Sequence, residues 1–387
     1  MKKRFVFFTA ILLAVSGAGF SQNLSVVLDS TINYTAGAGE AANHSVGFEQ
    51  FANFRLHLRG ERTTLITALN FIAITGNYLE AASLFASGNP HPYLAFTPII
   101  HGQNYAAGME LERLYFRVHG DHFDFETGLR RMPFGFGQVW GSSDFLNPRN
   151  PLAHNARPRG VLGADLTFYP THTMMLMLFA AAPRDPFVSD GGGFVPGISF
   201  EQHWSRASLQ ALYAFQTPHE LSGPGLHRFG LSARADLELG FILDALYTLN
   251  PNNGGGIQGL SFGFGFDYSF FGGDLYILAE YLFNGSASAS ALGFGGYWTN
   301  HHYLFASATY RFNDFSSAAL AAVFSFDDMS FSPILTVAYD LFQGFTLNLT
   351  ARVPLDREVL TGGRPGELGP VNSGARFILN AGARLRF

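Results

Sequence analysis

The chain has 387 residues, of which only 14% are charged and 15% are aromatic, and it contains no cysteine. The missing thiols exclude a disulfide-stabilised scaffold, thiolate metal sites, a cysteine nucleophile and a lipid-modified cysteine. A composition with 41 Phe is also too apolar for a disordered chain. The sequence therefore describes a folded protein, in water or in a membrane.

The N-terminus has the pattern of a secretory signal peptide. Basic residues at positions 2–4 precede an apolar run over 5–15, and small residues follow it. We expect residues 1–21 to be cleaved and residues 22–387 to form a single domain. Without the three basic residues, 21 Arg stand against 29 acidic residues, a net charge of about −8 that argues against binding nucleic acid.

After the signal, the longest apolar stretch runs from Met174 to Ala182, whereas a membrane-spanning helix needs about twenty apolar residues. The apolar residues instead fall at alternate positions, as in strands with one apolar and one polar face. Because lipid offers the backbone no hydrogen-bond partners, strands cross a membrane only as a closed barrel. The pattern therefore predicts an all-β protein, a transmembrane antiparallel barrel with short periplasmic turns and long external loops.

We count about 18 strands, with about 16 as the alternative. They are expected to begin near residues 24, 46, 64, 111, 123, 163, 173, 198, 207, 228, 241, 260, 275, 303, 318, 331, 345 and 376. The connectors alternate between short turns, such as residues 60–62, and long segments, such as 78–110. One connector, at 327–329, is short where the alternation predicts a long one.

The longest motif lies between the fifth and sixth predicted strands, where residues 128–151 read GLRRMPFGFGQVWGSSDFLNPRNP. This segment resembles one in porin-like channels of the outer membrane, in which Phe-Gly-x-Gly is followed by Asp-x-x-Asn-Pro. The matching residues are Arg130, Phe134, Gly135, Gly137, Asp144, Asn147 and Pro148. The resemblance implies a large single-chain channel and does not identify what passes through it.

The residues of this segment suit a compact loop. Gly135 and Gly137 permit backbone conformations closed to other residues, and Asp144 and Asn147 can close turns through their side chains. Pro148 ends strand pairing. We interpret the segment as a constriction loop that leans into the lumen, because long loops without secondary structure are usually functional. The alternative is an ordered external loop at the rim.

The charges that strand alternation assigns to the inner face form two groups. A basic wall comprises Arg55, Arg59, Arg113, Arg117, Arg130, Arg352, Arg376 and Arg384. An acidic wall comprises Asp244, Asp267 and Glu280. Facing walls of opposite sign would set a field across the lumen that favours polar solutes. Neighbouring opposite charges, such as Arg130 with Glu126, are instead expected to neutralise each other as ladders along the wall.

No spacing typical of a catalytic, metal or phosphate site is found, so we expect no enzyme activity, cofactor or metal. The least implausible catalytic group joins His154 to Ser142, Ser143 and Asp144, which we interpret as turn chemistry. His301 and His302 are adjacent on an extended segment, so their side chains point apart and do not readily chelate one ion.

The C-terminal strand alternates without a break. Its apolar side carries Phe377, Leu379, Ala381, Ala383, Leu385 and Phe387. The last eight residues resemble the signal that the barrel assembly machinery reads on the final strand of bacterial outer-membrane barrels. The matching residues are Asn380, Gly382, Leu385 and Phe387.

Together these features predict an outer-membrane protein surrounded by lipid, acting as a passive channel for small hydrophilic solutes, with anionic and sugar-like molecules as candidate classes. The alternative is a barrel plugged by its loops that serves as an adhesin or receptor. The sequence leaves the oligomeric state, ion selectivity and permeant open.

Overall fold

The computed structural model describes residues 21–37, 44–77, 97–147, 149–152, 160–182, 193–218, 225–251, 256–285, 298–356 and 366–387. None of the helices in these ranges is long and apolar enough to cross a bilayer. The predicted signal peptide lies outside the described residues except for Ser21, which begins the first strand.

Nearly all of the described secondary structure is β-strand. The strands are β1 (Ser21–Gly37), β2 (His44–Arg59), β3 (Thr63–Gly76), β4 (Thr97–His101), β5 (Tyr105–His119), β6 (Phe123–Arg130), β7 (Val161–Thr171), β8 (Met174–Ala182), β9 (Val195–His203), β10 (Ala207–Gln216), β11 (Leu226–Asp236), β12 (Gly240–Leu249), β13 (Leu260–Phe270), β14 (Leu275–Asn284), β15 (His302–Asn313), β16 (Ser316–Ser325), β17 (Phe331–Phe342), β18 (Phe345–Arg352) and β19 (Ala375–Arg386). Single helical turns occur at η1 (Ile257–Gly259), η2 (Phe271–Gly273) and α4 (Pro370–Ser373).

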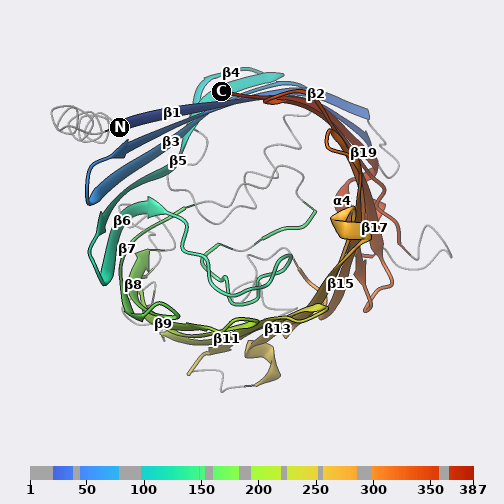
Figure 1. Cartoon of the computed structure of the whole chain (residues 1–387). Coiled ribbons are helices and arrows are strands. Elements are labelled where there is room, and N and C mark those ends of the chain that lie inside the picture. The colour runs from blue at the N-terminus through green and yellow to red at the C-terminus, as the bar shows by residue number, and fades with distance from the viewer. Residues whose placement is uncertain are drawn as a thin grey trace.

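Eighteen of these strands form one closed antiparallel barrel, which confirms the predicted fold and strand number (Figure 1). Each strand pairs with its neighbours in the chain, and β1 closes the ring by pairing with β19 over eleven residue pairs. Closure leaves no exposed edge among these eighteen strands, so each of them can satisfy its backbone hydrogen bonds within the ring, as a barrel in lipid requires.

The nineteenth strand, β4, is an addition at the rim. It pairs with β5 at Ala106–Met109, above the point where β6 stops pairing at Leu114. A tight turn, closed by the hydrogen bond from Gly102 N to Tyr105 O, joins β4 to β5. Consequently β5 begins at Tyr105 and not near residue 111 as expected, because its first residues pair with β3 beyond the height of β6.

Short turns and long loops lie at opposite ends of the barrel. The connection between β16 and β17, which breaks the expected alternation of lengths, lies at the long-loop end and is a small hairpin. The hydrogen bond from Ser325 N to Ser330 O closes the turn of this hairpin. The hairpin was therefore counted correctly, and the loop is simply short.

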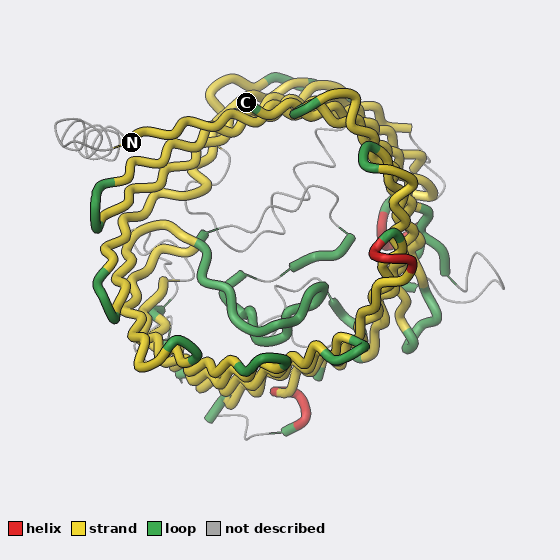
Figure 2. Tube along the Cα trace, in the orientation of Figure 1, coloured by secondary structure: helices red, strands yellow, loops and turns green. Residues whose placement is uncertain are grey.

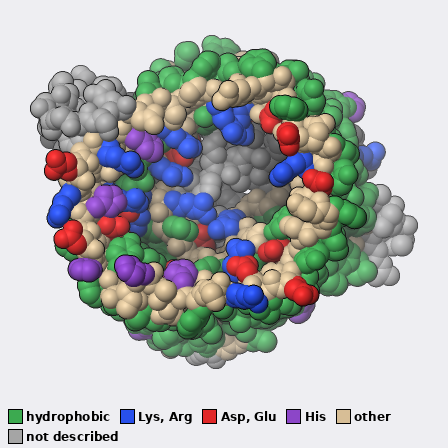
Figure 3. Space-filling model, viewed as in Figure 1, with side chains coloured by type: hydrophobic (Ala, Val, Ile, Leu, Met, Phe, Trp, Pro, Cys, Tyr) green, Lys and Arg blue, Asp and Glu red, His purple; other side chains and the backbone are tan. Residues whose placement is uncertain are grey.

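The two faces of the strands differ as expected for a barrel in lipid. The outer surface is covered with apolar side chains, whereas charged side chains gather around the hollow centre (Figure 3). On β11, for example, Phe229 and Leu231 are exposed on the outside, and Arg228 and Ser232, which flank this pair in the chain, are buried on the inside. This alternation is typical of transmembrane barrels, whose walls have an apolar outer face and a polar interior.

A β-bulge changes the inner face of β5. The pairing with β3 shifts between Ala68 and Leu69, where Arg113 and Leu111 are the partners and Glu112 is skipped. The bulge lets the consecutive residues Glu112 and Arg113 both face the lumen, which a regular strand forbids. Sequence alternation alone could not place Glu112 there.

Candidate channel constriction

The segment that connects β6 to β7 folds into the barrel. Figure 2 shows its described part, in green, inside the ring of strands and against one side of the wall. The described residues thus lie inside the ring, and the role of the segment as a constriction loop stays a prediction. Of the predicted loop residues, Pro148 lies outside the described residues, as does His154 of the cluster considered for catalysis.

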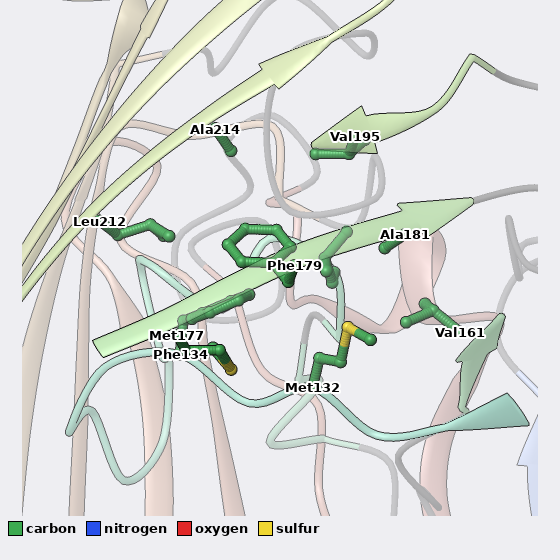
Figure 4. Close-up of a cluster of buried hydrophobic side chains, with 10 residues drawn as sticks. Met132, Phe134, Val161, Met177, Phe179, Ala181, Val195, Leu212 and Ala214 are labelled. Atoms are coloured by element: carbon green, nitrogen blue, oxygen red, sulfur yellow. The ribbon is translucent and has the colours of Figure 1, made fainter. Parts of the chain in front are cut away.

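Apolar side chains from two parts of the loop, before and after Trp140, hold it against the wall. Met132, Phe134 and Leu146 are each about 1% exposed and pack on inward-facing residues of β8 and β10 (Figure 4). Phe134 contacts Phe179 with ring centroids 5.0 Å apart and stacks on Phe145 at 5.9 Å. The inner faces of these strands are therefore apolar where the loop covers them.

A second apolar cluster surrounds the indole of Trp140, which lies between Phe134 and Leu146 in the chain. Trp140 is fully buried and meets Trp298 edge to face at 5.0 Å and Tyr303 at 5.8 Å. Leu278 and Leu282 of β14 complete the contact. The two clusters give the barrel a hydrophobic core inside its ring, on the side of β8–β15.

Carboxylates of the wall bind the loop between these clusters. Glu280 accepts three consecutive backbone N–H groups, from Gln138 at 3.0 Å, Val139 at 3.1 Å and Trp140 at 2.9 Å. Asp267 accepts a hydrogen bond from the side-chain amide of Gln138 at 2.8 Å. Both acidic residues therefore stabilise the loop conformation through charge-assisted hydrogen bonds.

Asp244 binds the loop at a second point. It accepts hydrogen bonds from the hydroxyl of Ser143 at 2.5 Å and the backbone N–H of Ser143 at 3.3 Å, and also from the hydroxyl of Ser232. Asp244 and Glu280 are each only 1% exposed. These two members of the acidic wall thus face inward, as assigned, but lie beneath the loop and out of contact with solvent in the lumen.

Two glycines of the loop sit where a side chain has no room. Gly135 has φ +78°, and a Cβ there would lie 2.1 Å from Ser143 Oγ and 2.6 Å from Asp244 Oδ1. A Cβ on Gly137 would lie 2.8 Å from the Gly141 backbone and 2.9 Å from Asp244 Oδ2. The Phe-Gly-x-Gly motif therefore reflects both a left-handed backbone at Gly135 and close contact with the Asp244 carboxylate.

Asp144 organises the inside of the loop. Its carboxylate lies 3.7 Å from an Arg131 nitrogen and 3.9 Å from an Arg149 nitrogen, and it accepts a hydrogen bond from Asn147 at 3.2 Å. Asn147 also donates to the carbonyl of Met132 at 2.7 Å, and Arg149 donates to the carbonyl of Gly137 at 2.8 Å. Burial raises the pKa of Asp144 to about 6, although both guanidiniums oppose the shift.

Most arginines of the predicted basic wall lie on the inner face of the barrel, but several are ion-paired. Arg55 and Arg113 lie 3.6 and 3.4 Å from the same carboxylate, that of Glu112. Arg384 donates to Asp29 at 2.6 Å. Glu112 and Asp29 are missing from the expected walls. Asp29 could have been found from its alternation with Thr31 and Asn33, whereas Glu112 depends on the bulge.

A mixed ladder occupies the wall next to these arginines. Glu126 binds both Arg117 and Arg130, and Arg130 also binds Asp165. The cross-strand register places Arg117 opposite Glu126 and Glu126 opposite Asp165, and Arg130 bridges the two neighbouring carboxylates. This arrangement matches the neutralising ladder expected for Arg130 and Glu126. Blue side chains are visible on this part of the inner wall, around β5 and β6 (Figure 3).

The remaining predicted residues lie near the closure. Arg352 donates to the loop carbonyl of Leu152 at 3.4 Å, and Arg59 lies at an inward position of β2. Arg376 is skipped where the pairing of β19 with β1 shifts, so the strand register does not assign it to the inner face. The positions of the predicted assembly signal also follow the alternation. Asn380 and Gly382 face inward, Leu385 faces outward, and Phe387 pairs with the backbone of Val26 just beyond β19.

Comparison with known proteins identifies the class of fold. No family model and no curated protein matches the chain. Solved outer-membrane porins match it over nearly its whole length. They include OccAB4 of Acinetobacter baumannii, with a TM-score of 0.59, 9% identity and coverage of 95% of this chain and 98% of that chain.

Two further solved structures are similar to this chain over nearly its whole length. The BenF-like porin of Pseudomonas fluorescens Pf-5 matches with a TM-score of 0.57 and 8% identity, covering 95% of this chain and 98% of that one. Pseudomonas aeruginosa OccK8 (OprE) matches with a TM-score of 0.55 and 10% identity, covering 96% and 99%. At these identities the likeness establishes that the chain has the fold of a porin barrel.

Proposed function

We propose that this protein is an outer-membrane channel through which small hydrophilic solutes diffuse passively. The observation that carries the proposal is the loop between β6 and β7, held inside the barrel by Asp244, Asp267 and Glu280. A loop so fixed narrows a barrel without closing its ends, which is how a wide barrel becomes a size-limited channel. The likeness to porin structures supports the same function.

Anionic and sugar-like molecules are the proposed solute classes. Arg131 and Arg149 share the single carboxylate of Asp144, so this group of the loop has a surplus of one positive charge. Guanidinium groups bind carboxylates and phosphates through paired hydrogen bonds. An arginine surplus at the constriction therefore favours anions.

The wall across the ring from the loop supports passage of uncharged polar solutes as well. The register places Thr336 opposite Thr350, Thr350 opposite Asn380 and Asn380 opposite Asn33, all on the inner face. Hydroxyl and amide groups can exchange hydrogen bonds with sugar hydroxyls as readily as with water. Asn33, Thr350 and Asn380 are 4%, 3% and 9% exposed, so the row supports sugar-like molecules only where Thr336 reaches the lumen.

The location follows from the same proposal. The apolar outer face would contact the lipid of the outer membrane, the signal peptide would direct export, and the barrel assembly machinery would read the C-terminal strand ending at Phe387.

Conductance of the refolded mature protein in a planar bilayer tests this function. We expect stable current steps and, in a salt gradient, a reversal potential that indicates anion preference. Replacing Arg131 and Arg149 with Gln should reduce that preference, while replacing the exposed turn residue Arg62 with Gln should not. No current from a correctly folded, heat-modifiable barrel would contradict the channel and favour the plugged adhesin or receptor.

A further inference from the structure

Three tyrosine–histidine pairs recur on the outer surface of the barrel at its long-loop end. In each pair the tyrosine hydroxyl shares a hydrogen bond with Nδ1 of a histidine on the adjacent strand. The pairs are Tyr34 with His44 at 2.9 Å, Tyr213 with His227 at 3.0 Å, and Tyr281 with His302 at 2.6 Å. They lie on separate hairpins, β1–β2, β10–β11 and β14–β15.

The three pairs have the same geometry. In each, the histidine lies two residues before the residue directly opposite the tyrosine, which is Val46, Phe229 or Leu304. The paired rings are stacked, with centroids 5.9, 6.2 and 6.2 Å apart. Because three different sequence contexts produce one diagonal arrangement, the pair is a repeated structural unit and not a chance contact.

Each pair faces away from the lumen. Tyr213 lies between Leu212 and Ala214, which belong to the core inside the barrel, and Tyr281 lies between the buried Glu280 and Leu282. Neighbouring strand residues point to opposite faces, so the tyrosines point outward. Toward the other end of the barrel, the same outer face continues with apolar residues such as Phe229 and Leu231. The pairs therefore mark the edge of the apolar band.

The geometry leaves one polar atom of each imidazole available. When the hydroxyl donates to Nδ1, the proton of the imidazole resides on Nε2, and an imidazolium also carries a proton there. No hydrogen bond to Nε2 of His44, His227 or His302 is formed within the described part of the chain. The rings of Phe215 and Phe283, with centroids 4.9 and 5.3 Å from those of His227 and His302, help to fix two of the imidazoles.

A lipid tail cannot accept the Nε2 proton, and leaving such a donor unsatisfied at the edge of the apolar band costs free energy. Lipid headgroups are expected where an apolar band ends, and a lipid phosphate is a strong acceptor. We propose that the three Tyr–His pairs bind the phosphate groups of lipids in the leaflet on the long-loop side. The tyrosine orients the imidazole, and the imidazole donates from Nε2 to a phosphate oxygen.

Lipid titration followed by native mass spectrometry of the refolded mature protein tests the proposal. The probes are phosphatidylglycerol and a glucosyl diacylglycerol with the same chains but no phosphate. The test variant is H44Q/H227Q/H302Q, and the matched control is H57Q/H119Q/H203Q, whose histidines lie on the inner face. We expect the test variant to lose about ten-fold in affinity for phosphatidylglycerol, with no change in the control or for the glucolipid.

Equal affinity of the test variant and wild type for phosphatidylglycerol would overturn the proposal, as would equally tight binding of the glucolipid by wild type. Full displacement of phosphatidylglycerol by excess inorganic phosphate would instead identify a free-anion site, which also overturns it. Should the histidine variant not fold, Y34F/Y213F/Y281F keeps the rings and removes the orienting hydroxyls. We expect weaker phosphatidylglycerol binding from this variant too, and unchanged binding would contradict the proposal.

Discussion

Glu280 of β14 and Trp140 of the loop are joined by two hydrogen bonds. The Glu280 carboxylate accepts the backbone N–H of Trp140 at 2.9 Å, and the Glu280 carbonyl accepts the indole N–H at 3.0 Å. Both residues are almost completely buried. The position of the loop therefore depends on one charged side chain of the wall together with one aromatic side chain of the loop.

Glu280→Gln should loosen the loop. The amide keeps one acceptor oxygen in place of two, so at least one of the three loop N–H groups loses its partner, at a cost of about 1–3 kcal/mol. We expect larger and noisier single-channel currents. Asp340→Asn, which changes an inner carboxylate that binds Thr346 far from the loop, is the control. Currents identical to wild type would show that Glu280 does not hold the loop.

Neutralising Asp244, Asp267 and Glu280 together should change the position of the loop and not only the ion selectivity of the channel. Because two of these residues are buried under the loop, their main contribution is to the loop position. We expect the triple variant to admit larger polymers in a solute-exclusion experiment, with increased conductance. A changed reversal potential with an unchanged exclusion limit would mean instead that the three residues act as an exposed acidic wall.

Gly135→Ala should displace the loop locally. The new methyl group would meet Ser143 Oγ at 2.1 Å, and φ +78° is unfavourable for alanine. Gly141→Ala is a matched control, since φ is also positive there, at +55°, but the nearest atom lies 3.4 Å from the new Cβ. We expect faster proteolysis within the loop for Gly135→Ala than for Gly141→Ala. Equal proteolysis rates for the two variants would indicate that the contact with Ser143 does not displace the loop and that only the positive φ at each glycine contributes.

The channel should become more anion-selective as the pH falls from 7 to 5. Burial raises the pKa of Asp144 to about 6, so its carboxylate takes up a proton in this range. In the unfolded chain the same carboxylate takes up a proton only at about pH 4, the ordinary pKa of an aspartate. Protonation relieves the cost of burying the charge, so this group favours the folded loop below pH 6. Protonation of Asp144 also removes the negative charge that faces Arg131 and Arg149, which raises the preference for anions.

Reversal potentials measured across this pH range check that expectation. Asp144→Asn should show high anion preference at pH 7 and no step near pH 6. Asp340→Asn should keep the step, because this residue lies on β17, away from the loop. A step of wild-type size in Asp144→Asn would assign the titration to another group.

Alternation along the chain determined the fold. The period of two, the absence of a long apolar run and the regular connector lengths together specify a closed barrel, because only that structure satisfies the backbone in lipid. The inward position of Asp244, Asp267 and Glu280 also followed from alternation, since side chains on a strand point to opposite faces in turn.

Only the tertiary structure decided what those residues contact. Glu280 and Trp140 are separated by 140 residues, and no local pattern indicates that the loop would bring their polar groups together. Likewise, the pairing shift that turns Glu112 toward Arg55 arises from the match between β3 and β5 and not from either strand alone. Strand period is a local property of the chain, whereas the burial of a wall residue depends on which distant segment covers it.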